Sequence, residues 1–267
     1  MIDNVLISKL DWQTYDRYVR ETSPVVLLPV GSLEQHGPHL PLDCDSVIPT
    51  AISQTVAPLI GGLVAPTISY GYKSQPKSGG GQHFSGTTSL DAMTLIATVR
   101  DVIKEFARHG VRKMALLIGH YENTMFVIEG IDLALRDLRA DGIHDMKVLR
   151  IDYWDFTSQN TLVSAYPEGF PGWPLEHAGV METSVMLHLH PEFVHMDRCP
   201  THGPVFFPAF DVYPFDPARG SQSGALSSAK IATPEKGRMM FEEYVSGISE
   251  ALREEFALSL TRQRSVR

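Results

Sequence analysis

The 267-residue sequence lacks several features that would place it in a special class of protein. Its two cysteines, Cys44 and Cys199, are too few for the disulfide framework of a secreted domain, so we expect both to remain thiols. No apolar run is long enough to span a bilayer, and the amino-terminal segment is charged throughout, without the apolar core of a signal peptide. These absences predict a cytoplasmic protein that has no membrane partner.

Basic residues are also scarce, with 23 Lys and Arg against 31 Asp and Glu. No run of Lys and Arg is interleaved with aromatic residues, as is typical of nucleic-acid-binding proteins. We therefore expect no nucleic-acid partner. A small neutral or cationic substrate suits the charge better.

Common catalytic signatures are missing as well. There is no G-x-S-x-G elbow, and neither cysteine has a papain-like context, so nothing favours a covalent serine or cysteine mechanism. The glycine-rich segment KSGGGQHF lacks the G-x-x-x-x-G-K-[ST] spacing of a phosphate-binding loop. Its glycines instead allow the backbone to approach a ligand closely, and Ser78 offers a hydroxyl group there.

Short β-branched apolar runs alternate with longer helical patterns, which is typical of βαβ units. We predict an α/β fold, with residues 1–267 forming a single layered domain around a mostly parallel sheet flanked by helices. The expected strands are 25–30, 62–70, 113–118 and 147–154.

Three helices are predicted from apolar periodicity and capping residues. The first follows Thr88 or Ser89 as cap and ends before Gly110, the second runs from the cap Asn123 to Gly142, and the third runs from Pro234 to about Leu258. Residues 201–224 are rich in Pro, Phe and Gly and too long for an ordinary connection. We expect this segment to be a lid or an arm that packs on a neighbouring subunit.

Polar motifs follow each expected strand, at the edge where ligands bind in open parallel sheets. They are GSLEQHGPHLPLDCD, GYKSQPKSGGGQHFSG, GHYEN and WDF. The first and third offer oxygen and imidazole donors of the kind that suits zinc or manganese, from Glu34, His36, Asp45, His120 and Glu122.

Five donors are too many for one open catalytic zinc, which normally has three protein ligands. Two metals that share Asp45 as a bridge would use all five. A single Glu or His in a loop is usually a solvated side chain or a local cap, and this interpretation stays open for each residue taken alone. The grouping at the ends of two buried strands favours the metal site.

Other polar residues receive structural interpretations. We expect His39, Asp43 and Cys44 to support the site rather than bind metal, because a soft thiolate is out of place among hard carboxylates. His83 is interpreted as structural, and His188, His190 and His195 as polar groups near a helix carboxyl end. His177 lies beside small residues, where its ring could face a pocket and exchange a proton.

Taken together, these motifs resemble the creatininase (creatinine amidohydrolase) family. The resemblance rests on GSLEQHGPHLPLDCD, GYKSQPKSGGGQHFSGTTSLDAMT, GHYEN, IDYWDF, PEGFPGW, EHAGVMETSVML and LSSAK, in order over nearly the whole chain. The first motif marks the broad superfamily. Tyr121 and Glu122 after His120, with Trp154 and Trp173, are more selective, since related enzymes carry a GHGGN-type turn at this position.

The resemblance implies a binuclear zinc or manganese hydrolase that interconverts creatinine and creatine and assembles as a homo-hexamer. It assigns Glu34, Asp45 and His120 to one metal, and His36, Asp45 and Glu122 to the other. It also implies that Ser78 and Tyr121 contact the substrate, that Trp154 and Trp173 close over it, and that His177 donates a proton.

On this basis we expect a metal-bridging hydroxide to attack the carbonyl of a cyclic amide, with Glu122 positioning or deprotonating water and His177 protonating the leaving nitrogen. The aromatic residues suit a planar guanidine-like ring, although packing in the core is the alternative. Two departures from the family pattern are Ile118, in place of an asparagine, and Pro174, in place of an acidic residue. Pro174 favours the main alternative, an amidohydrolase of the same superfamily that acts on a formamide or modified peptide. A non-catalytic metal-binding scaffold is the more distant alternative.

Overall fold

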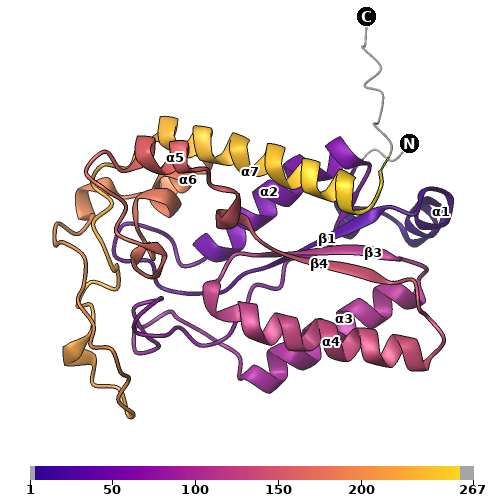
Figure 1. The fold of residues 1–267 in the computed structure, drawn as a ribbon, viewed down its shortest axis with the longest axis horizontal. Coiled ribbons are helices and arrows are strands. Elements are labelled where there is room, and N and C mark those ends of the chain that lie inside the picture. Colours follow the sequence, from indigo (N-terminus) through magenta and orange to yellow (C-terminus); the bar gives the residue numbers. More distant parts are fainter. Residues whose placement is uncertain (1–3, 259–267) are drawn as a thin grey trace, which may run out of the picture.

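The computed structural model describes residues 4–258 and has the predicted α/β architecture. In these residues the sheet has the order β2-β1-β3-β4 with all pairs parallel. Its strands are β1 (Val25–Val30), β2 (Leu63–Val64), β3 (Lys113–Ile118) and β4 (Lys147–Asp152). The layered, parallel-sheet prediction is confirmed (Figure 1). That residues 1–267 form one domain stays a prediction.

Helices cover both faces of the sheet. The α-helices of the described chain are α1 (Trp12–Thr22), α2 (Cys44–Ile60), α3 (Ala92–Arg108), α4 (Thr124–Ala140), α5 (Gln159–Ala165), α6 (Val180–Leu189) and α7 (Pro234–Glu255). Figure 1 shows α2 and α7 on one face and α3 and α4 on the other. Among residues 4–258, no helix combines the length and apolar character needed to cross a membrane.

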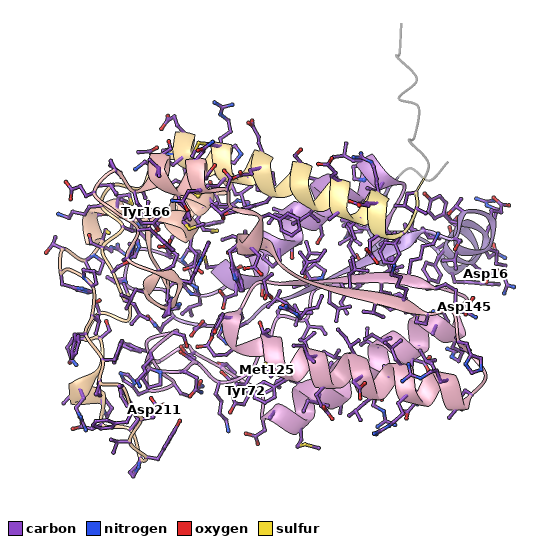
Figure 2. All side chains as sticks on the ribbon, in the orientation of Figure 1. Asp16, Tyr72, Met125, Asp145, Tyr166 and Asp211 are labelled. Carbon is purple, nitrogen blue, oxygen red and sulfur yellow. The ribbon has the colours of Figure 1, made fainter. Side chains whose placement is uncertain are left out.

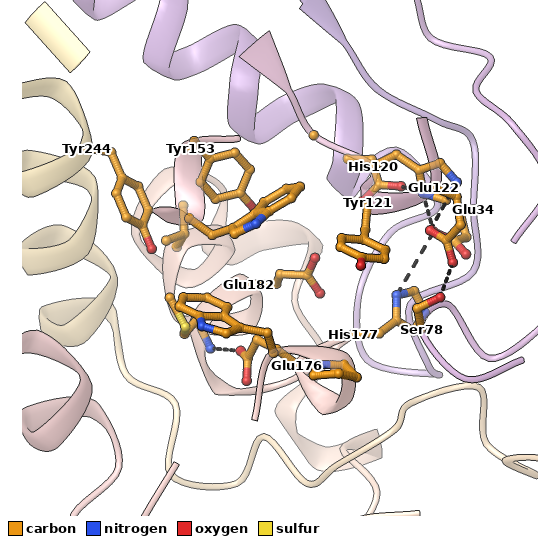
Figure 3. A pocket seen from close by; sticks show the side chains of 17 residues that line it. Glu34, Ser78, His120, Tyr121, Glu122, Tyr153, Glu176, His177, Glu182 and Tyr244 are labelled. Atoms are coloured by element: carbon orange, nitrogen blue, oxygen red, sulfur yellow. Dashed lines mark hydrogen bonds and ion pairs between the residues drawn. The ribbon is translucent and has the colours of Figure 1, made fainter. Parts of the chain in front are cut away.

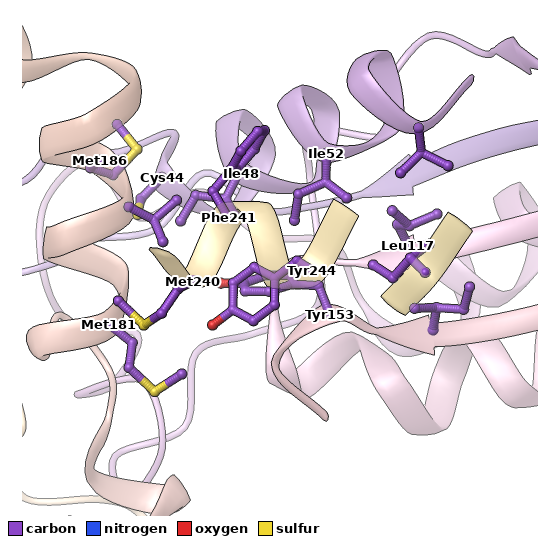
Figure 4. Close-up of a cluster of buried hydrophobic side chains, with 14 of the residues drawn as sticks. Cys44, Ile48, Ile52, Leu117, Tyr153, Met181, Met186, Met240, Phe241 and Tyr244 are labelled. Carbon is purple, nitrogen blue, oxygen red and sulfur yellow. The ribbon is translucent and has the colours of Figure 1, made fainter. Parts of the chain in front are cut away.

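The central strands β1 and β3 are apolar except for Lys113, because each face of the sheet packs on helices. Successive side chains of a strand point to opposite faces, so β1 contributes Val25 and Leu27 to the core under α2, α6 and α7, and Val26 and Leu28 to the core over α3 and α4. Figure 4 shows part of the first of these cores. The sheet is therefore a rigid platform whose strand ends position the loops.

The second predicted strand is much shorter in the structure. Residues 62–70 were expected to pair throughout, but β2 contains only Leu63 and Val64. Pro66 has no N–H to donate to the ladder, and pairing with β1 resumes only as an isolated bridge between Val30 and Ile68. The fourth strand likewise ends at Asp152, because the chain turns there into a short 3₁₀ helix, Tyr153–Phe156.

The predicted helix ends are partly wrong. The backbone of Thr88 donates to Leu33 O at 2.9 Å and the Ser89 hydroxyl donates to Gln82, so neither caps α3, which begins after Asp91. Its end near Gly110, at φ 97°, is confirmed. The helix α7 begins as predicted behind Thr233 but ends at Glu255, before Leu258.

The helix α2 was not predicted, because its sequence has no amphipathic pattern and contains Pro49 and Pro58. It is apolar on nearly all sides because it lies between the sheet and α7, where both neighbours bury it. The motif GSLEQHGPHLPLDCD is therefore a loop only in its first part. Cys44 and Asp45 lie in the first turn of α2.

Residues 201–224 form an extended segment, drawn in orange at the left of Figure 1. Its one described helical turn is the short 3₁₀ helix Pro217–Arg219. The side chains of Phe206 and Tyr213 are 89% and 78% exposed. The role of this segment as a lid or as a contact to another subunit stays a prediction.

Candidate active site

The predicted metal-binding residues meet at one edge of the sheet. Glu34 and His36 lie in the loop after β1, His120 follows β3 after Gly119, and Asp45 lies in the first turn of α2. All four side chains are buried. The carboxyl ends of parallel strands share one edge, which is why segments distant in sequence converge here.

Each of the two histidines donates one ring N–H to a backbone carbonyl. In His120, Nε2 lies 3.0 Å from Tyr72 O, and in His36, Nδ1 lies 3.1 Å from Glu34 O. A carbonyl oxygen only accepts, so these nitrogens carry the proton in the neutral ring. The other nitrogen of each ring therefore presents a lone pair to the centre of the site.

Both lone pairs point at carboxylate oxygens. His120 Nδ1 lies 2.9 Å from Glu34 Oε2 and 3.0 Å from Asp45 Oδ2. His36 Nε2 lies 3.0 Å from Asp45 Oδ1 and 3.7 Å from Glu182 Oε1. A ring nitrogen that faces buried anions at such distances needs positive charge between them, supplied either by a proton or by a metal cation.

These contacts form two sets of donors, one around His120 with Glu34 and one around His36 with Glu182. Asp45 belongs to both sets, since one of its oxygens faces each histidine. Three buried atoms of the cluster, Glu34 Oε1, His36 Nε2 and Asp45 Oδ2, make no hydrogen bond of acceptable geometry within the described chain. Unpartnered buried donors and acceptors of this kind fit two divalent cations that share one carboxylate.

The pKa values of His36, His120 and Glu34 show that the buried carboxylates favour positive charge in the site. Burial alone lowers the pKa of His36 and His120, but the carboxylates around both rings outweigh it and hold each pKa well above its usual range. Burial raises the pKa of Glu34 to about 8, partly offset by His120. In the protein without metal, protons neutralise the cluster, so binding of cations there releases protons.

Glu122 lies on the side of Glu34 and His120. Its Oε2 is 3.5 Å from His120 Nε2, and its Oε1 accepts hydrogen bonds from the Ser78 hydroxyl at 2.6 Å and from Gln75 N at 3.1 Å. The pairing of Glu122 with His36, which the family resemblance implies, therefore differs from the geometry. These bonds hold the carboxylate away from His36, where Glu182 lies instead.

His177 lies against the same cluster, on a segment that precedes α6. Its Nε2 is 2.9 Å from Gln35 O, its Nδ1 is 4.0 Å from Glu34 Oε2, and its ring centre is 4.4 Å from that of His36. Burial, with His36 nearby, holds the pKa of His177 well below its usual range. Gln35 Nε2 lies 3.0 Å from the same ring nitrogen, but its two N–H groups donate to Gly79 O and Gly224 O. The neutral ring therefore donates Nε2–H to Gln35 O and keeps an Nδ1 lone pair beside the carboxylates.

A pocket with aromatic walls opens beside the cluster (Figure 3). The predicted substrate residues Ser78, Tyr121, Trp154 and Trp173 all line it, together with Glu34, Asp45, His120, Glu122 and His177. Tyr121 and Trp173 lie at its rim, 62% and 40% exposed, while Trp154 contacts the ring of Tyr153 at 5.1 Å. The structure thus brings together all the predicted site residues; His36 alone of them does not line the pocket, and its Nε2 lies 3.0 Å from Oδ1 of Asp45, which does.

The residues interpreted as structural lie outside the pocket lining. His39 is buried and its Nε2 lies 3.1 Å from the Thr183 hydroxyl, and Cys44 packs in the core with a thiol whose pKa is raised by burial. Asp43 precedes the first turn of α2. His83 stacks on Phe84. None of these residues, nor His188, His190 or His195, belongs to the metal-binding groups found among residues 4–258.

Sequence reasoning missed two residues of the site. Glu182 completes the set around His36. The backbone oxygen of Gln35 accepts a hydrogen bond from His177. The side-chain Nε2 of Gln35 donates to Gly79 O at 2.8 Å and to Gly224 O at 3.2 Å. The spacing of Glu182 from His177 follows no ligand motif. Gln35 gave a weak signal, since it stands between the donors Glu34 and His36.

Comparisons with known proteins agree with this architecture. Residues 8–252 match the family model Creatininase, described as creatinine amidohydrolase. The chain is 53% identical to the creatinine amidohydrolase of Pseudomonas putida, over 96% of this chain and 99% of the relative. It is also 34% identical to the mycofactocin precursor peptide peptidase of Mycobacterium ulcerans, over 84% of this chain and 82% of that relative.

Three solved structures extend the match to the backbone. A mutant creatininase of Zn-Zn type superposes with a TM-score of 0.94 at 53% identity, covering 96% of this chain and 99% of that one. A mutant creatininase complexed with creatine and a manganese form of creatininase each give a TM-score of 0.93, at 53% and 54% identity. Each of these two comparisons covers 95% of this chain and 99% of the other.

Proposed function

The chain belongs to the creatininase family, and from this premise we propose that it is a metal-dependent amidohydrolase that interconverts creatinine and creatine. The observation that carries the proposal is the pair of buried sets, each with a histidine lone pair facing carboxylates, that share Asp45 beside an aromatic pocket. A similar protein, complexed with creatine, has nearly the same backbone.

We propose that two divalent cations, zinc or manganese as in the similar structures, occupy the two sets. Glu34, Asp45 and His120 would hold the first, with Glu122 next to them, and His36, Asp45 and Glu182 the second. Assignment of Glu182 to the second set replaces the assignment of Glu122 that the family resemblance implies. When bound, the cations would supply a Lewis acid for the amide carbonyl and make water more acidic.

The chain itself would position the substrate and move the protons. Glu122, fixed by Ser78, and the neutral Nδ1 of His177 are the groups in the pocket that can accept a proton from water. His177 would then deliver that proton to the ring nitrogen as the carbon–nitrogen bond breaks. Gln35 O holds the opposite ring nitrogen, so the proton is carried on Nδ1, which faces the cluster.

The aromatic walls suit a flat substrate with guanidine character. Tyr121, Trp154 and Trp173 surround the entrance, and each can attract a cationic or planar group by about 0.5–2 kcal/mol when water is excluded. Glu182 adds a carboxylate to the same pocket. A modified peptide, the alternative suggested by Pro174 and by the similar peptidase, would have to leave its chain outside these walls.

One set of assays tests the proposal. The protein is stripped of metal, reloaded with zinc or manganese, and assayed for loss of creatinine as wild type, Glu122→Gln and His177→Ala. We expect turnover in the loaded wild type and a fall of about a hundredfold or more in each variant. Cleavage of a formamide or peptide without loss of creatinine would favour the related amidohydrolases, and loss of neither would favour the scaffold. A metal content near one per chain would contradict the shared Asp45.

We further propose that the protein works in the cytoplasm as a homo-hexamer. Support for a reducing compartment comes from Cys44 and Cys199, which are buried and free. Support for an assembly comes from the extended segment 201–224 with its exposed aromatic side chains. Sedimentation of the purified protein would give the mass of the assembly.

A further inference from the structure

Two of the site residues, His177 and Glu182, come from one short segment at the start of α6. The segment makes a tight turn, in which Ala178 adopts φ 54° and its N–H donates to Glu182 Oε2 at 2.6 Å. A non-glycine residue at positive φ is held there only when its surroundings impose the conformation. The surroundings of this turn therefore decide where both side chains lie.

The buried carboxyl group of Glu176 bonds to the backbone of this turn. Its Oε1 accepts the Met181 N–H at 2.5 Å, and its Oε2 forms a short contact with the Tyr166 hydroxyl. Gly179 leaves the space, since a Cβ there would lie 2.6 Å from Glu176 Oε2. Glu176 thus connects the end of α5, near Tyr166, to the first turn of α6 (Figure 2 labels Tyr166).

The same tyrosine also reaches the rim of the pocket. The ring of Tyr166 lies 5.0 Å from that of Phe170, which in turn lies 5.0 Å from the ring of Trp173. The bond from Met181 N–H to the Glu176 carboxyl is the dashed line beside Glu176 in Figure 3. Tyr166 is therefore linked to Trp173 through Phe170, and to the turn that carries His177 and Glu182 through Glu176.

We propose that Tyr166 and Glu176 are positioning residues, which act on the reaction through His177 and Glu182. The inference rests on the proposed function, because it assigns Glu182 to the second cation set. If the turn relaxes, Glu182 moves from its 3.7 Å approach to His36, and the second cation loses a ligand. Mutation of a residue that orients a metal ligand typically lowers the affinity for the metal, or the activity, by about tenfold to a hundredfold.

The test compares Tyr166→Phe, Glu176→Ala and Glu176→Gln in the full chain. Metal retained per chain after dialysis against a weak chelator is measured by mass spectrometry, and kcat and KM are measured with creatinine. We expect Glu176→Ala to retain one cation where wild type retains two, with kcat lower by about tenfold to a hundredfold and KM within about threefold. Tyr166→Phe should show an intermediate loss. Glu176→Gln, which keeps an acceptor for Met181 and a polar partner for Tyr166, should restore most of both properties.

Tyr18→Phe is the matched control, because it likewise removes a tyrosine hydroxyl that donates a hydrogen bond, here to Gly61 O at 3.1 Å and outside the site. Metal retention and kcat like wild type in both Tyr166→Phe and Glu176→Ala would overturn the proposal. So would a loss in Glu176→Gln as large as in Glu176→Ala, since charge or substrate contact would then explain it. If Glu176→Ala does not fold, Tyr166→Phe still decides between these outcomes. Metal retention does not depend on the substrate, so a wild type that leaves creatinine intact contradicts only the proposed function.

Discussion

Replacement of Gly119 gives the sharpest prediction, because the structure leaves no room for a side chain at this position. It lies between β3 and His120, and a Cβ at this position would lie 1.9 Å from Asp45 O and 2.6 Å from Pro49 Cγ. Its φ is not in the left-handed region, so alanine would be tolerated there if there were room. The variant Gly119→Ala therefore tests whether close contact between β3 and α2 sets the metal site.

The magnitude follows from the distance. The alanine Cβ and Asp45 O must separate by about 1.5 Å to reach an ordinary contact, so the first turn of α2 has to move with Asp45. Overpacking of this kind costs roughly 1–3 kcal/mol, or roughly 2–12 °C in the unfolding midpoint of a chain of this size. A displacement of about 1 Å in a reacting group costs on the order of a hundredfold in rate.

The assay measures the unfolding midpoint, the metal retained per chain and kcat for Gly119→Ala and for Gly203→Ala. Gly203 is a matched control, since a Cβ there meets nothing within 4 Å and the residue is exposed. We expect Gly203→Ala to behave as wild type and Gly119→Ala to lose stability, metal and turnover together. The reasoning is refuted if the two variants have the same midpoint and the same metal content.

Three further predictions concern single side chains. Asp45→Asn removes the carboxylate shared by both sets, so the chain should retain less than one cation and lose turnover by at least about a hundredfold; retention of both cations by elemental analysis would contradict the bridge. Ser78→Ala removes the 2.6 Å bond to Glu122, so kcat should fall by about tenfold with little change in thermal unfolding, and an unchanged kcat would show that Glu122 needs no such support. Burial raises the pKa of Glu176 from its ordinary value of 4.5 to about 8, so the folded chain keeps a proton that the unfolded chain releases between these values. The unfolding free energy of wild type, relative to that of Glu176→Gln, should therefore be highest below pH 4.5 and should decrease as the pH rises through 8. Urea unfolding at pH 5 and at pH 8 measures this difference between the two proteins, and the same difference at both pH values would contradict the burial of Glu176.

Local sequence determined the platform of the fold. VVLLPV is apolar at every position and KMALLI at every position after Lys113, which is typical of strands covered on both faces, and each is followed at once by a glycine and a polar residue. The donors Glu34, His36 and His120 could be assigned to the strand ends on this basis. The pairing of Asp45 with both histidines could be predicted from the number of donors alone.

The helix α2 shows where local pattern fails. Its residues have no polar face, because the sheet and α7 bury it from both sides, and periodicity cannot distinguish such a helix from a loop with apolar residues. Asn123 shows the same limit at the level of one side chain. It precedes α4 as predicted, but its amide donates to Gly31 O at 2.9 Å and accepts from Tyr72 N at 2.7 Å, which ties together three strand-end segments instead of capping the helix.

The sequence by itself determined which residue types stand at the ends of the strands, because burial of a strand and the turn after it are properties of neighbouring residues. Only the tertiary structure decided that Glu182, rather than Glu122, faces His36, and that Tyr72 O and Glu34 O fix which nitrogen of each histidine is free. These choices depend on contacts between segments distant in the chain. Their distances are set by the packing of α2 and α6 on the sheet, and no spacing along the sequence encodes them.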